Sequence, residues 1–264
     1  MALMQCSFFS ESLGMCTSAN VIVPQPTLGQ IGLEGKGSPA GCPVLYLLHG
    51  LSDDHSIWLR RTSIERYATA FGIAVVMPHG YRSFYTDQVK TDIKYWQYVS
   101  DELPKLINGF FKFSQKREDT FVAGLSMGGY GAMKLAFNKP ETFAAAGCFS
   151  SVVRPWQFVD VAPAMKAELQ CLFGDDPAAN VGTLNDPLAM SEKQVKAGVP
   201  LTEVYQACGT EDFLYSENQI LREHLTAIGY PFTYHEEPGC HEWGFWDRQV
   251  LAYLNWLKEN NLLK

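Results

Sequence analysis

The chain has 264 residues, of which 47% are hydrophobic, 13% aromatic and 19% charged, and its formal net charge is −7. This composition is typical of a globular protein and excludes a mostly disordered chain or a charge-rich coiled coil. The acidic balance leaves no basic surface for nucleic acid or anionic lipid, and no apolar stretch approaches the roughly 18 residues of a membrane span.

Apolar residues alternate along the chain between strand-like and helix-like spacing. In chain order the predicted elements are an opening hairpin (Ser7–Phe9 and Val21–Val23), a glycine-rich surface loop (Gly29–Gly41), a strand (Val44–Leu48), a helix (Ile57–Phe71), a strand (Ile73–Met77), a helix that Pro104 bends or splits (Tyr95–Phe111), a strand (Thr120–Ala123), a helix (Met127–Asn138), two strands (Phe143–Phe149 and Leu201–Ala207), a helix (Glu217–Ile228), a strand (Phe232–His235) and a helix (Phe245–Leu257). This alternation predicts an α/β fold, with a mostly parallel, doubly wound sheet and helices on both faces. The length suits one domain over residues 1–264.

One segment, Val152–Pro200, interrupts the alternation after the sixth predicted strand. It contains prolines at positions 155, 163, 177 and 187 and shows no clear period. Because it is too long for an ordinary loop, we interpret it as an irregular insertion. It is either a cap over a site or a set of irregular surface helices.

The cysteines and the first residues indicate the compartment. Seven cysteines occur at irregular spacing without a CxxC pair, which favours free thiols in a reducing cytoplasm. Residues 1–16 lack a basic start and contain Glu11, so they do not resemble a signal peptide. We therefore expect a cytoplasmic protein; a secreted protein with an odd thiol is the alternative.

The run Gly124-Leu125-Ser126-Met127-Gly128 matches the G-x-S-x-G pattern. An apolar strand ends just before it and a helical pattern begins at Met127, as a nucleophile elbow requires. Such a turn holds the serine in strained backbone geometry above the edge of the sheet, and glycines flank it because Cβ atoms would clash. The sequence thus predicts Ser126 as a nucleophile; a serine that only caps a helix is the alternative.

A serine hydroxyl needs a base, and in this kind of fold an acid and then a histidine follow the serine in the chain. His241 lies in the loop between the last strand and the last helix, from which it can reach Ser126, whereas His224 falls within a predicted helix and His235 at a strand end. Asp212 follows the preceding strand and would hold the imidazole in the correct tautomer. Glu211 stays open as a competitor for this role.

The run His49-Gly50-Leu51-Ser52 leaves the strand Val44–Leu48 where such folds place a backbone donor of the oxyanion hole. We assign the N–H groups of Leu51 and Met127 to this hole. We expect His49 to be structural and to bond the loop. Losing one oxyanion donor typically costs about 2.7–4 kcal/mol of barrier.

Other patterns predict no metal and no cofactor. The dense run from His235 to Glu242 has neither H-E-x-x-H nor CxxC spacing. No Walker loop and no G-x-G-x-x-G after a strand occurs. The core is the ordinary place for a tryptophan, but Trp243 is a candidate for the substrate pocket because it lies two residues from His241. Trp58 and Tyr85 are further candidates for substrate binding.

Together these motifs resemble the esterase D-like α/β-hydrolases, and most of all the branch with tributyrin, feruloyl and acetyl esterases. The resemblance spans about residues 4–257. The residues that carry it are His49-Gly50-Leu51-Ser52 with His55 and Trp58, Tyr85-Thr86-Asp87, Gly124-Leu125-Ser126-Met127-Gly128-Gly129-Tyr130-Gly131, Gly209-Thr210-Glu211-Asp212-Phe213-Leu214-Tyr215 and Cys240-His241-Glu242-Trp243. The resemblance implies an α/β-hydrolase fold and a cofactor-free hydrolase of short acyl esters, often oligomeric. It implies Ser126, Asp212 and His241 as the triad, and Leu51 and Met127 as oxyanion donors.

The main hypothesis is a serine carboxylesterase that acts on a small-molecule ester of an acetyl, butyryl, feruloyl or carbohydrate-acetyl kind. One alternative is another acyl-transfer enzyme, either a thioesterase of the S-formylglutathione hydrolase kind or an acyltransferase. A second alternative is a binding module that kept the hydrolase fold without the chemistry. Comparing the turnover of S-formylglutathione with that of aryl esters distinguishes the first alternative from a carboxylesterase. Labelling of Ser126 by a fluorophosphonate distinguishes an active enzyme from a binding module.

Overall fold

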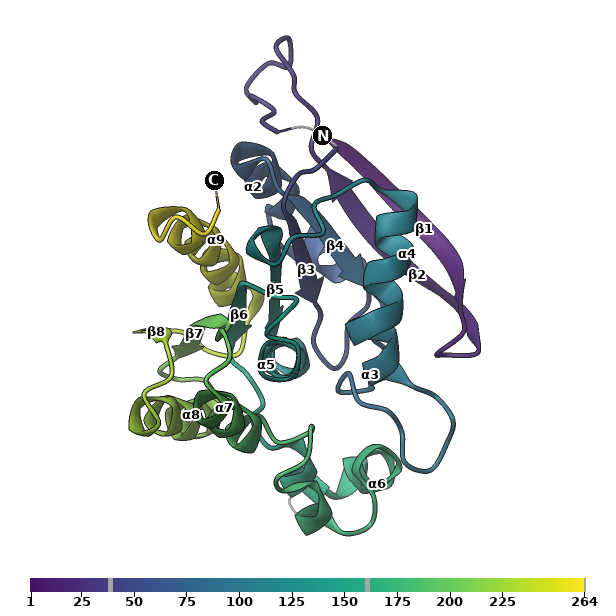
Figure 1. The fold of residues 1–264 in the computed structure, drawn as a ribbon, viewed down its shortest axis with the longest axis vertical. Helices are drawn as coiled ribbons and strands as arrows, with labels where there is room; N and C mark the ends of the chain where they lie inside the picture. The colour runs from purple at the N-terminus through teal and green to yellow at the C-terminus, as the bar shows by residue number, and fades with distance from the viewer. Residues whose placement is uncertain (38–39, 160–161, 264) are drawn as a thin grey trace.

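The computed structural model describes residues 1–37, 40–159 and 162–263. Eight strands form one sheet in the order β1-β2-β4-β3-β5-β6-β7-β8 (Figure 1). The strands are β1 (Ala2–Ser10), β2 (Met15–Val23), β3 (Val44–Leu48), β4 (Ala74–Pro78), β5 (Thr120–Leu125), β6 (Ala145–Phe149), β7 (Glu203–Gly209) and β8 (Phe232–Glu237). The pairs from β4 through β3, β5, β6 and β7 to β8 are parallel, whereas β1–β2 and β2–β4 are antiparallel. The predicted α/β-hydrolase fold is therefore confirmed.

Helices cover both faces of the sheet (Figure 1). They are α1 (Ile57–Arg61), α2 (Ile64–Phe71), α3 (Tyr95–Gln97), α4 (Leu103–Phe110), α5 (Met127–Asn138), α6 (Lys166–Phe173), α7 (Pro187–Ala197), α8 (Tyr215–Ala227) and α9 (Trp243–Glu259). Residues of α1, α2 and α9 belong to one buried apolar cluster, and residues of α4, α5 and α8 to the other.

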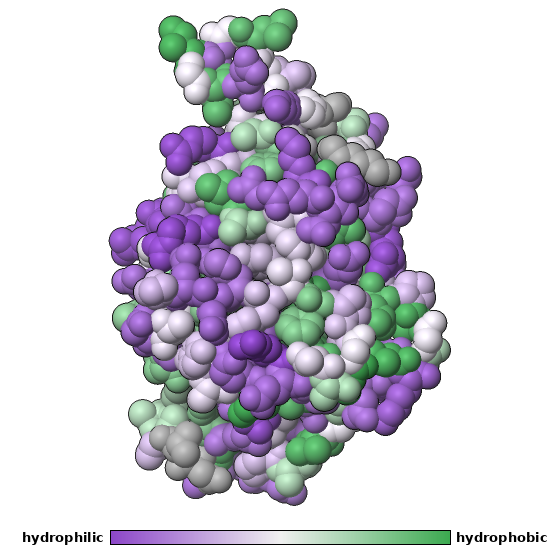
Figure 2. All heavy atoms as spheres, turned by 90° about the vertical axis from the view of Figure 1, so that its left-hand side faces the viewer, coloured by the Kyte–Doolittle hydropathy of each residue, from purple (hydrophilic) through white to green (hydrophobic). Residues whose placement is uncertain are grey.

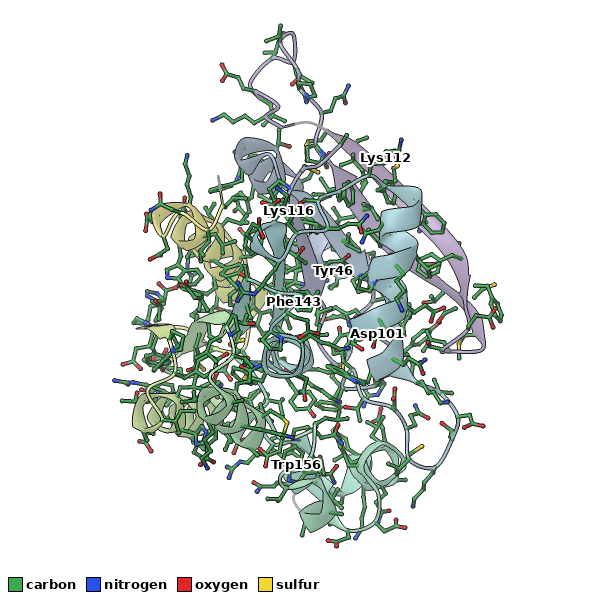
Figure 3. The ribbon with its side chains drawn as sticks, in the orientation of Figure 1. Tyr46, Asp101, Lys112, Lys116, Phe143 and Trp156 are labelled. Atoms are coloured by element: carbon green, nitrogen blue, oxygen red, sulfur yellow. The ribbon has the colours of Figure 1, made fainter. Side chains whose placement is uncertain are left out.

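Strand β3 shows how the two clusters arise. All five of its residues are buried, and successive side chains of a strand point to opposite faces. Tyr46 belongs to the cluster under α4 and α5, whereas Leu47 belongs to the cluster under α2 and α9. Figure 3 labels Tyr46 and Phe143, whose rings meet edge-on with centroids 6.2 Å apart. The apolar run predicted as a buried strand therefore contributes side chains to the apolar clusters on both faces of the sheet.

Two predicted helices differ in the structure from a single regular α-helix. The helix expected at Ile57–Phe71 becomes α1 and α2 because Thr62 is extended, with φ −133° and ψ 173°. The helix expected at Tyr95–Phe111 becomes α3 and α4, joined by a π-helical stretch at Tyr98–Glu102. Pro104 lies in the first turn of α4, just after the π-helical stretch, and has no N–H to donate to the preceding turn. The backbone stays helical on both sides of it, so the proline is accommodated by wider turns and does not break the helix.

The predicted surface loop, Gly29–Gly41, protrudes beyond β2, and its residues 38–39 lie outside the described residues. A bridge between Thr27 and Gly35 ties its base together. Leu28 and Ile31 are fully exposed, and Figure 2 shows hydrophobic atoms at this protruding end, at the top of the view.

The segment Val152–Pro200 follows β6 as predicted, and its residues 160–161 lie outside the described residues. It contains α6, α7 and short 3-10 turns, and is more regular than expected. Trp156, labelled in Figure 3, packs edge-on against Phe173 of α6, with ring centroids 6.2 Å apart. A bidentate ion pair from Arg82 to Glu168 of α6, at 2.6 and 2.8 Å, joins this segment to the loop after β4.

Within the described residues, no helix has the length and apolar character needed to cross a bilayer.

Candidate active site

Ser126 lies between the end of β5 and the first residue of α5. Its φ of 54° and ψ of −115° are unusual for a residue with a side chain, and such a conformation costs about 1–3 kcal/mol. The Ser126 N–H donates to Phe149 O at 2.9 Å, and its carbonyl accepts from the N–H groups of Tyr130 and Val152. These bonds hold the strained turn and leave the Ser126 side chain half-buried at the edge of the sheet.

The two glycines of the motif are required by close backbone contacts. A Cβ atom on Gly124 would lie 2.3 Å from Gly128 O, and one on Gly128 would lie 2.4 Å from Leu48 O and 2.7 Å from His49 O. Neither neighbour is a flexible side chain that could move away. The glycines therefore let β5, α5 and the loop after β3 meet at Ser126.

We expect Gly128→Ala to destabilise the protein by about 1–3 kcal/mol, because the added methyl overpacks fixed backbone. Gly109 is a matched control, since a Cβ at this position in α4 meets nothing within 4 Å. Gly109→Ala should be neutral or stabilise the helix by about 0.5–1 kcal/mol. Calorimetric melting of both variants tests this; unchanged stability of Gly128→Ala would contradict the packing argument.

His241 and Asp212 form a hydrogen-bonded pair at the same edge of the sheet. His241 Nδ1 lies 2.9 Å from Asp212 Oδ2 and 3.1 Å from Oδ1. The Asp212 side chain is fully buried, and its Oδ1 also accepts from Leu214 N–H at 2.8 Å. Burial raises the pKa of the Asp212 carboxyl, but the bonds from His241 and Leu214 outweigh this effect and place the pKa below its usual range. The buried group is therefore an anion that can orient an imidazole.

Glu211, the competing acid, has a different partner. Its Oε2 accepts from Gly239 N–H at 2.6 Å, and its own N–H donates to Gly239 O at 3.1 Å. Glu211 thus joins the loop after β7 to the loop that carries His241. The structure brings Asp212, and not Glu211, to the imidazole.

Ser126 and the His241–Asp212 pair follow different strands of the sheet. Ser126 follows β5, Asp212 follows β7 and His241 follows β8, and β6 lies between the first two. The carboxyl ends of parallel strands share one edge, so all three loops lie on the same side of the sheet. Among the described residues, no hydrogen bond joins Ser126 Oγ to the imidazole. Hydrogen bonds of catalytic groups are often long before substrate binds.

Residues between these loops support the imidazole. Trp246 packs edge-on to His241, with ring centroids 4.8 Å apart, and its Nε1 donates to Ser150 Oγ at 3.1 Å. Ser150 follows β6, is fully buried and has a φ of 46°. Trp246 is buried, as expected of a core tryptophan, whereas Ser150 was not predicted from the sequence. The position of Ser150 at the end of a buried strand, between the strands of Ser126 and Asp212, is the signal that could have found it.

His49 orients the predicted oxyanion loop. Its Nδ1 lies 2.7 Å from Gly50 O, and its Nε2 accepts from Gly80 N–H at 2.8 Å. Because Nε2 is an acceptor, the neutral ring carries its proton on Nδ1 and donates to Gly50 O. The peptide is planar and trans, so the Leu51 N–H points away from this carbonyl. The expectation that His49 is structural and bonds the loop agrees with these contacts.

The two N–H groups assigned to the oxyanion hole lie in the loop after β3 and at the start of α5. Met127 is the first residue of α5, so its N–H has no partner in the helix and lies at the positive end of the helix dipole. Neither Leu51 N–H nor Met127 N–H donates a hydrogen bond within the described part of the chain. The contact of Gly128 with the His49 carbonyl brings the two segments together.

The environment of His49 predicts a pH dependence of stability. Burial is the largest contribution and outweighs the hydrogen bond to Gly50, lowering the pKa of His49 from 6.5 to about 4. Between these values the unfolded chain binds more protons than the folded one. The free energy of unfolding should therefore fall as the pH drops from 6.5 to 4, by about 1.4 kcal/mol per pH unit from this group.

Urea unfolding at several pH values between 7 and 4.5, for the wild type and His49→Gln, measures this contribution. The variant should lose stability less steeply on acidification, because glutamine does not titrate. Equal slopes for the two proteins would show that His49 does not carry the effect.

The three predicted pocket residues have different positions. Tyr85 and Trp58 are buried, at 0% and 1% exposure. Tyr85 Oη donates to His49 O and Trp58 Nε1 donates to Leu48 O, each at 3.0 Å. Trp243 is half-buried and packs edge-on against Trp58 and Trp246. The contacts of Tyr85 and Trp58 are thus with the backbone that leads into the oxyanion loop; substrate contact by the three residues stays a prediction.

The other histidines after Ser126 lie elsewhere. His224 Nε2 is 2.9 Å from Leu188 O, and His235 Nε2 is 3.4 Å from Glu237 Oε2. Within the described ranges, no group of three or more histidine, cysteine, aspartate or glutamate side chains is arranged to hold a metal ion. The structure thus places Ser126 at a strained turn and pairs the His241 imidazole with a buried carboxylate; their joint action with the N–H groups of Leu51 and Met127 stays a proposal.

Known proteins resemble this chain over nearly its whole length. A model of the family named Esterase, described as "Putative esterase", matches residues 35–257. The acetyl esterase of Caldicellulosiruptor saccharolyticus is 29% identical in an alignment of 272 positions, which covers 98% of this chain and 99% of that protein. The fluorophosphonate-binding serine hydrolase F of Staphylococcus aureus, solved with substrate bound, is 31% identical with a TM-score of 0.86 and covers 97% of this chain and 98% of that one. An S-formylglutathione hydrolase of the same species, solved as the apoenzyme, is also 31% identical, with a TM-score of 0.83 and the same coverage.

Proposed function

The chain belongs to the Esterase family and is a carboxylic ester hydrolase, and we propose that it hydrolyses short-chain acyl esters through Ser126, His241 and Asp212. The observation that carries the proposal is the strained backbone of Ser126 at the N-terminus of α5. A helical cap does not require φ of 54°, whereas a nucleophile presented above a sheet edge does.

In the first half of the reaction, Ser126 Oγ attacks the ester carbonyl while His241 Nε2 takes its proton. Asp212 accepts the Nδ1 hydrogen bond, so Nε2 is the basic nitrogen and the imidazolium that forms lies beside an anion. The negative charge on the carbonyl oxygen is held by the N–H groups of Leu51 and Met127. His241 then protonates the departing alcohol, which leaves an acyl group on Ser126.

In the second half, water attacks the acyl-enzyme, with His241 again as the base. The same two N–H groups hold the second oxyanion. The alcohol and the acid are released in turn, and Ser126 recovers its proton from His241. Every proton moves between the substrate, water, Ser126 and His241, so the cycle needs no cofactor.

Short acyl esters are the substrate class that the resemblances support best. The C. saccharolyticus relative is named an acetyl esterase and aligns with nearly the whole chain. To test this, p-nitrophenyl acetate, butyrate and octanoate should be compared with methyl ferulate at equal concentration. We expect acetate and butyrate to give the highest kcat/KM; preference for octanoate would exclude a short-chain esterase.

A thioesterase that acts on S-formylglutathione is the second candidate. The observation that favours it is the 31% identity and TM-score of 0.83 to an S-formylglutathione hydrolase. The same triad would attack a thioester. If kcat/KM for S-formylglutathione exceeds that for p-nitrophenyl acetate by more than about tenfold, the thioester is the better substrate and the ester proposal is replaced.

We also propose a cytoplasmic location and a cap. Six of the cysteines are free thiols, which supports a reducing compartment: Cys6, Cys16, Cys148, Cys171, Cys208 and Cys240. The ion pair of Arg82 with Glu168 supports a cap role for residues 152–200 within one domain. Oligomer formation stays a prediction from the family resemblance.

A further inference from the structure

Phe213 is an exposed aromatic residue in contact with the proposed base. It lies between the buried Asp212 and Leu214 and is 74% exposed, more than the exposed phenylalanines Phe9 and Phe110 at 52% and 55%. Its ring centroid is 4.5 Å from that of His241, with 49° between the planes. A phenyl ring left in water next to a catalytic imidazole offers an unused apolar surface.

The loop that carries Phe213 is firmly held. Leu214 N–H donates to Asp212 Oδ1, and Tyr215 N–H donates to Asp212 O at 2.9 Å. Glu211 is bound to Gly239 through both its carboxylate and its N–H. The backbone on both sides of Phe213 is therefore fixed, and this places the Cα of Phe213 where its ring reaches His241.

The reaction mechanism determines which part of the substrate lies near the Phe213 ring. His241 gives its proton to the leaving oxygen, so the alcohol portion of the ester must lie beside the imidazole. The carbonyl oxygen faces Leu51 and Met127, in the loop after β3 and at the start of α5. One flank of the imidazole is occupied by the buried Trp246. Phe213 occupies another flank and is open to solvent.

We propose that Phe213 is a specificity-determining residue that selects esters of apolar, aromatic alcohols by packing against the alcohol portion. This inference rests on the proposed function, because it takes His241 as the proton donor to the leaving group. It concerns the alcohol and makes no claim about the acyl chain.

The test compares ethyl acetate with 2-phenylethyl acetate in the wild type and Phe213→Ala. The two alcohols are primary and differ by a phenyl group, and both esters form the same acetyl-enzyme, so kcat/KM reports acylation alone. We expect Phe213→Ala to lower kcat/KM for 2-phenylethyl acetate about tenfold and for ethyl acetate less than twofold. Phe213→Tyr, which keeps the ring, should retain the wild-type ratio.

Phe110→Ala is the matched control, since it removes an exposed phenyl ring that packs on Phe8 of β1, the edge strand at the opposite end of the sheet from β8. It should leave both values unchanged. An equal loss on both esters in Phe213→Ala would overturn the inference, because the ring would then only support His241. No loss on either ester would overturn it as well. Failure of the proposed function gives a different result, namely that Ser126→Ala still hydrolyses both esters.

Discussion

Ser126→Ala is expected to lower kcat for p-nitrophenyl acetate by about 10⁴-fold or more while the protein stays folded. Removal of the nucleophile leaves only the oxyanion hole and substrate binding, which retain a small residual rate. The fold should persist because the turn is held by backbone bonds, among them Ser126 N–H to Phe149 O. Steady-state kinetics and circular dichroism on the same preparation measure both effects.

The control for this variant is Ser7→Ala, which removes an exposed hydroxyl from the edge strand β1. It should keep activity within about twofold, as surface substitutions usually do. Full activity of a folded, purified Ser126→Ala protein would remove the nucleophile from the proposed mechanism.

Asp212→Asn is expected to lower kcat/KM by about 10³- to 10⁴-fold with little change in fold, because the isosteric amide no longer fixes the tautomer of His241. The amide can donate to Nδ1, which would place the imidazole proton on Nε2 and remove the base that faces Ser126. The loss should be smaller at high pH, where hydroxide can replace the base in part. A pH profile of kcat/KM from 6 to 10 measures it.

Glu211→Gln is the matched control because it changes the neighbouring carboxylate in the same way. Its amide oxygen can still accept from Gly239 N–H, so we expect a loss of less than about fivefold. If Glu211→Gln lost as much activity as Asp212→Asn, the assignment of the buried carboxylate as the triad acid would be wrong.

Elements with strong local signals were predicted to the residue. The strand β3 is an uninterrupted apolar run that ends before His49-Gly50, and α5 begins directly after Ser126, as predicted. The division into α1 and α2 was not predicted because one of the contacts that cause it involves a residue far away in the sequence. Thr62 Oγ1 donates to Trp58 O, and Ser63 N–H donates to Asp247, a residue of α9. The first contact is local, but the second depends on packing between helices far apart in the sequence.

The insertion after β6 contains helix-boundary residues from which α7 could have been predicted. Asp186 caps α7 by accepting from the N–H groups of Leu188 and Ala189. Pro187 occupies the first turn, and Gly198 ends the helix with a φ of 64°. An Asp-Pro start and a Gly stop are ordinary helix boundaries. The prolines that suggested irregular structure instead include one that begins a helix.

The candidate site was predictable in part. The serine elbow follows from a local pattern, and His241 follows from chain order. The choice of Asp212 over Glu211 depends on which carboxylate turns inward, and this is decided by the contact of Glu211 with Gly239. The contact of Phe213 with His241 joins the loops after β7 and β8, and the bond from Trp246 to Ser150 joins α9 to the end of β6. No short-range pattern encodes such contacts.

The most direct measurement is mapping of a covalent adduct. The protein is treated with a fluorophosphonate, digested with trypsin and analysed by mass spectrometry. The expected product is one adduct in the peptide of residues 118–134, whose only serine is Ser126, with loss of esterase activity in proportion to labelling. An adduct on another residue, or unmodified Ser126 in protein that the reagent has inactivated, would contradict the proposed nucleophile.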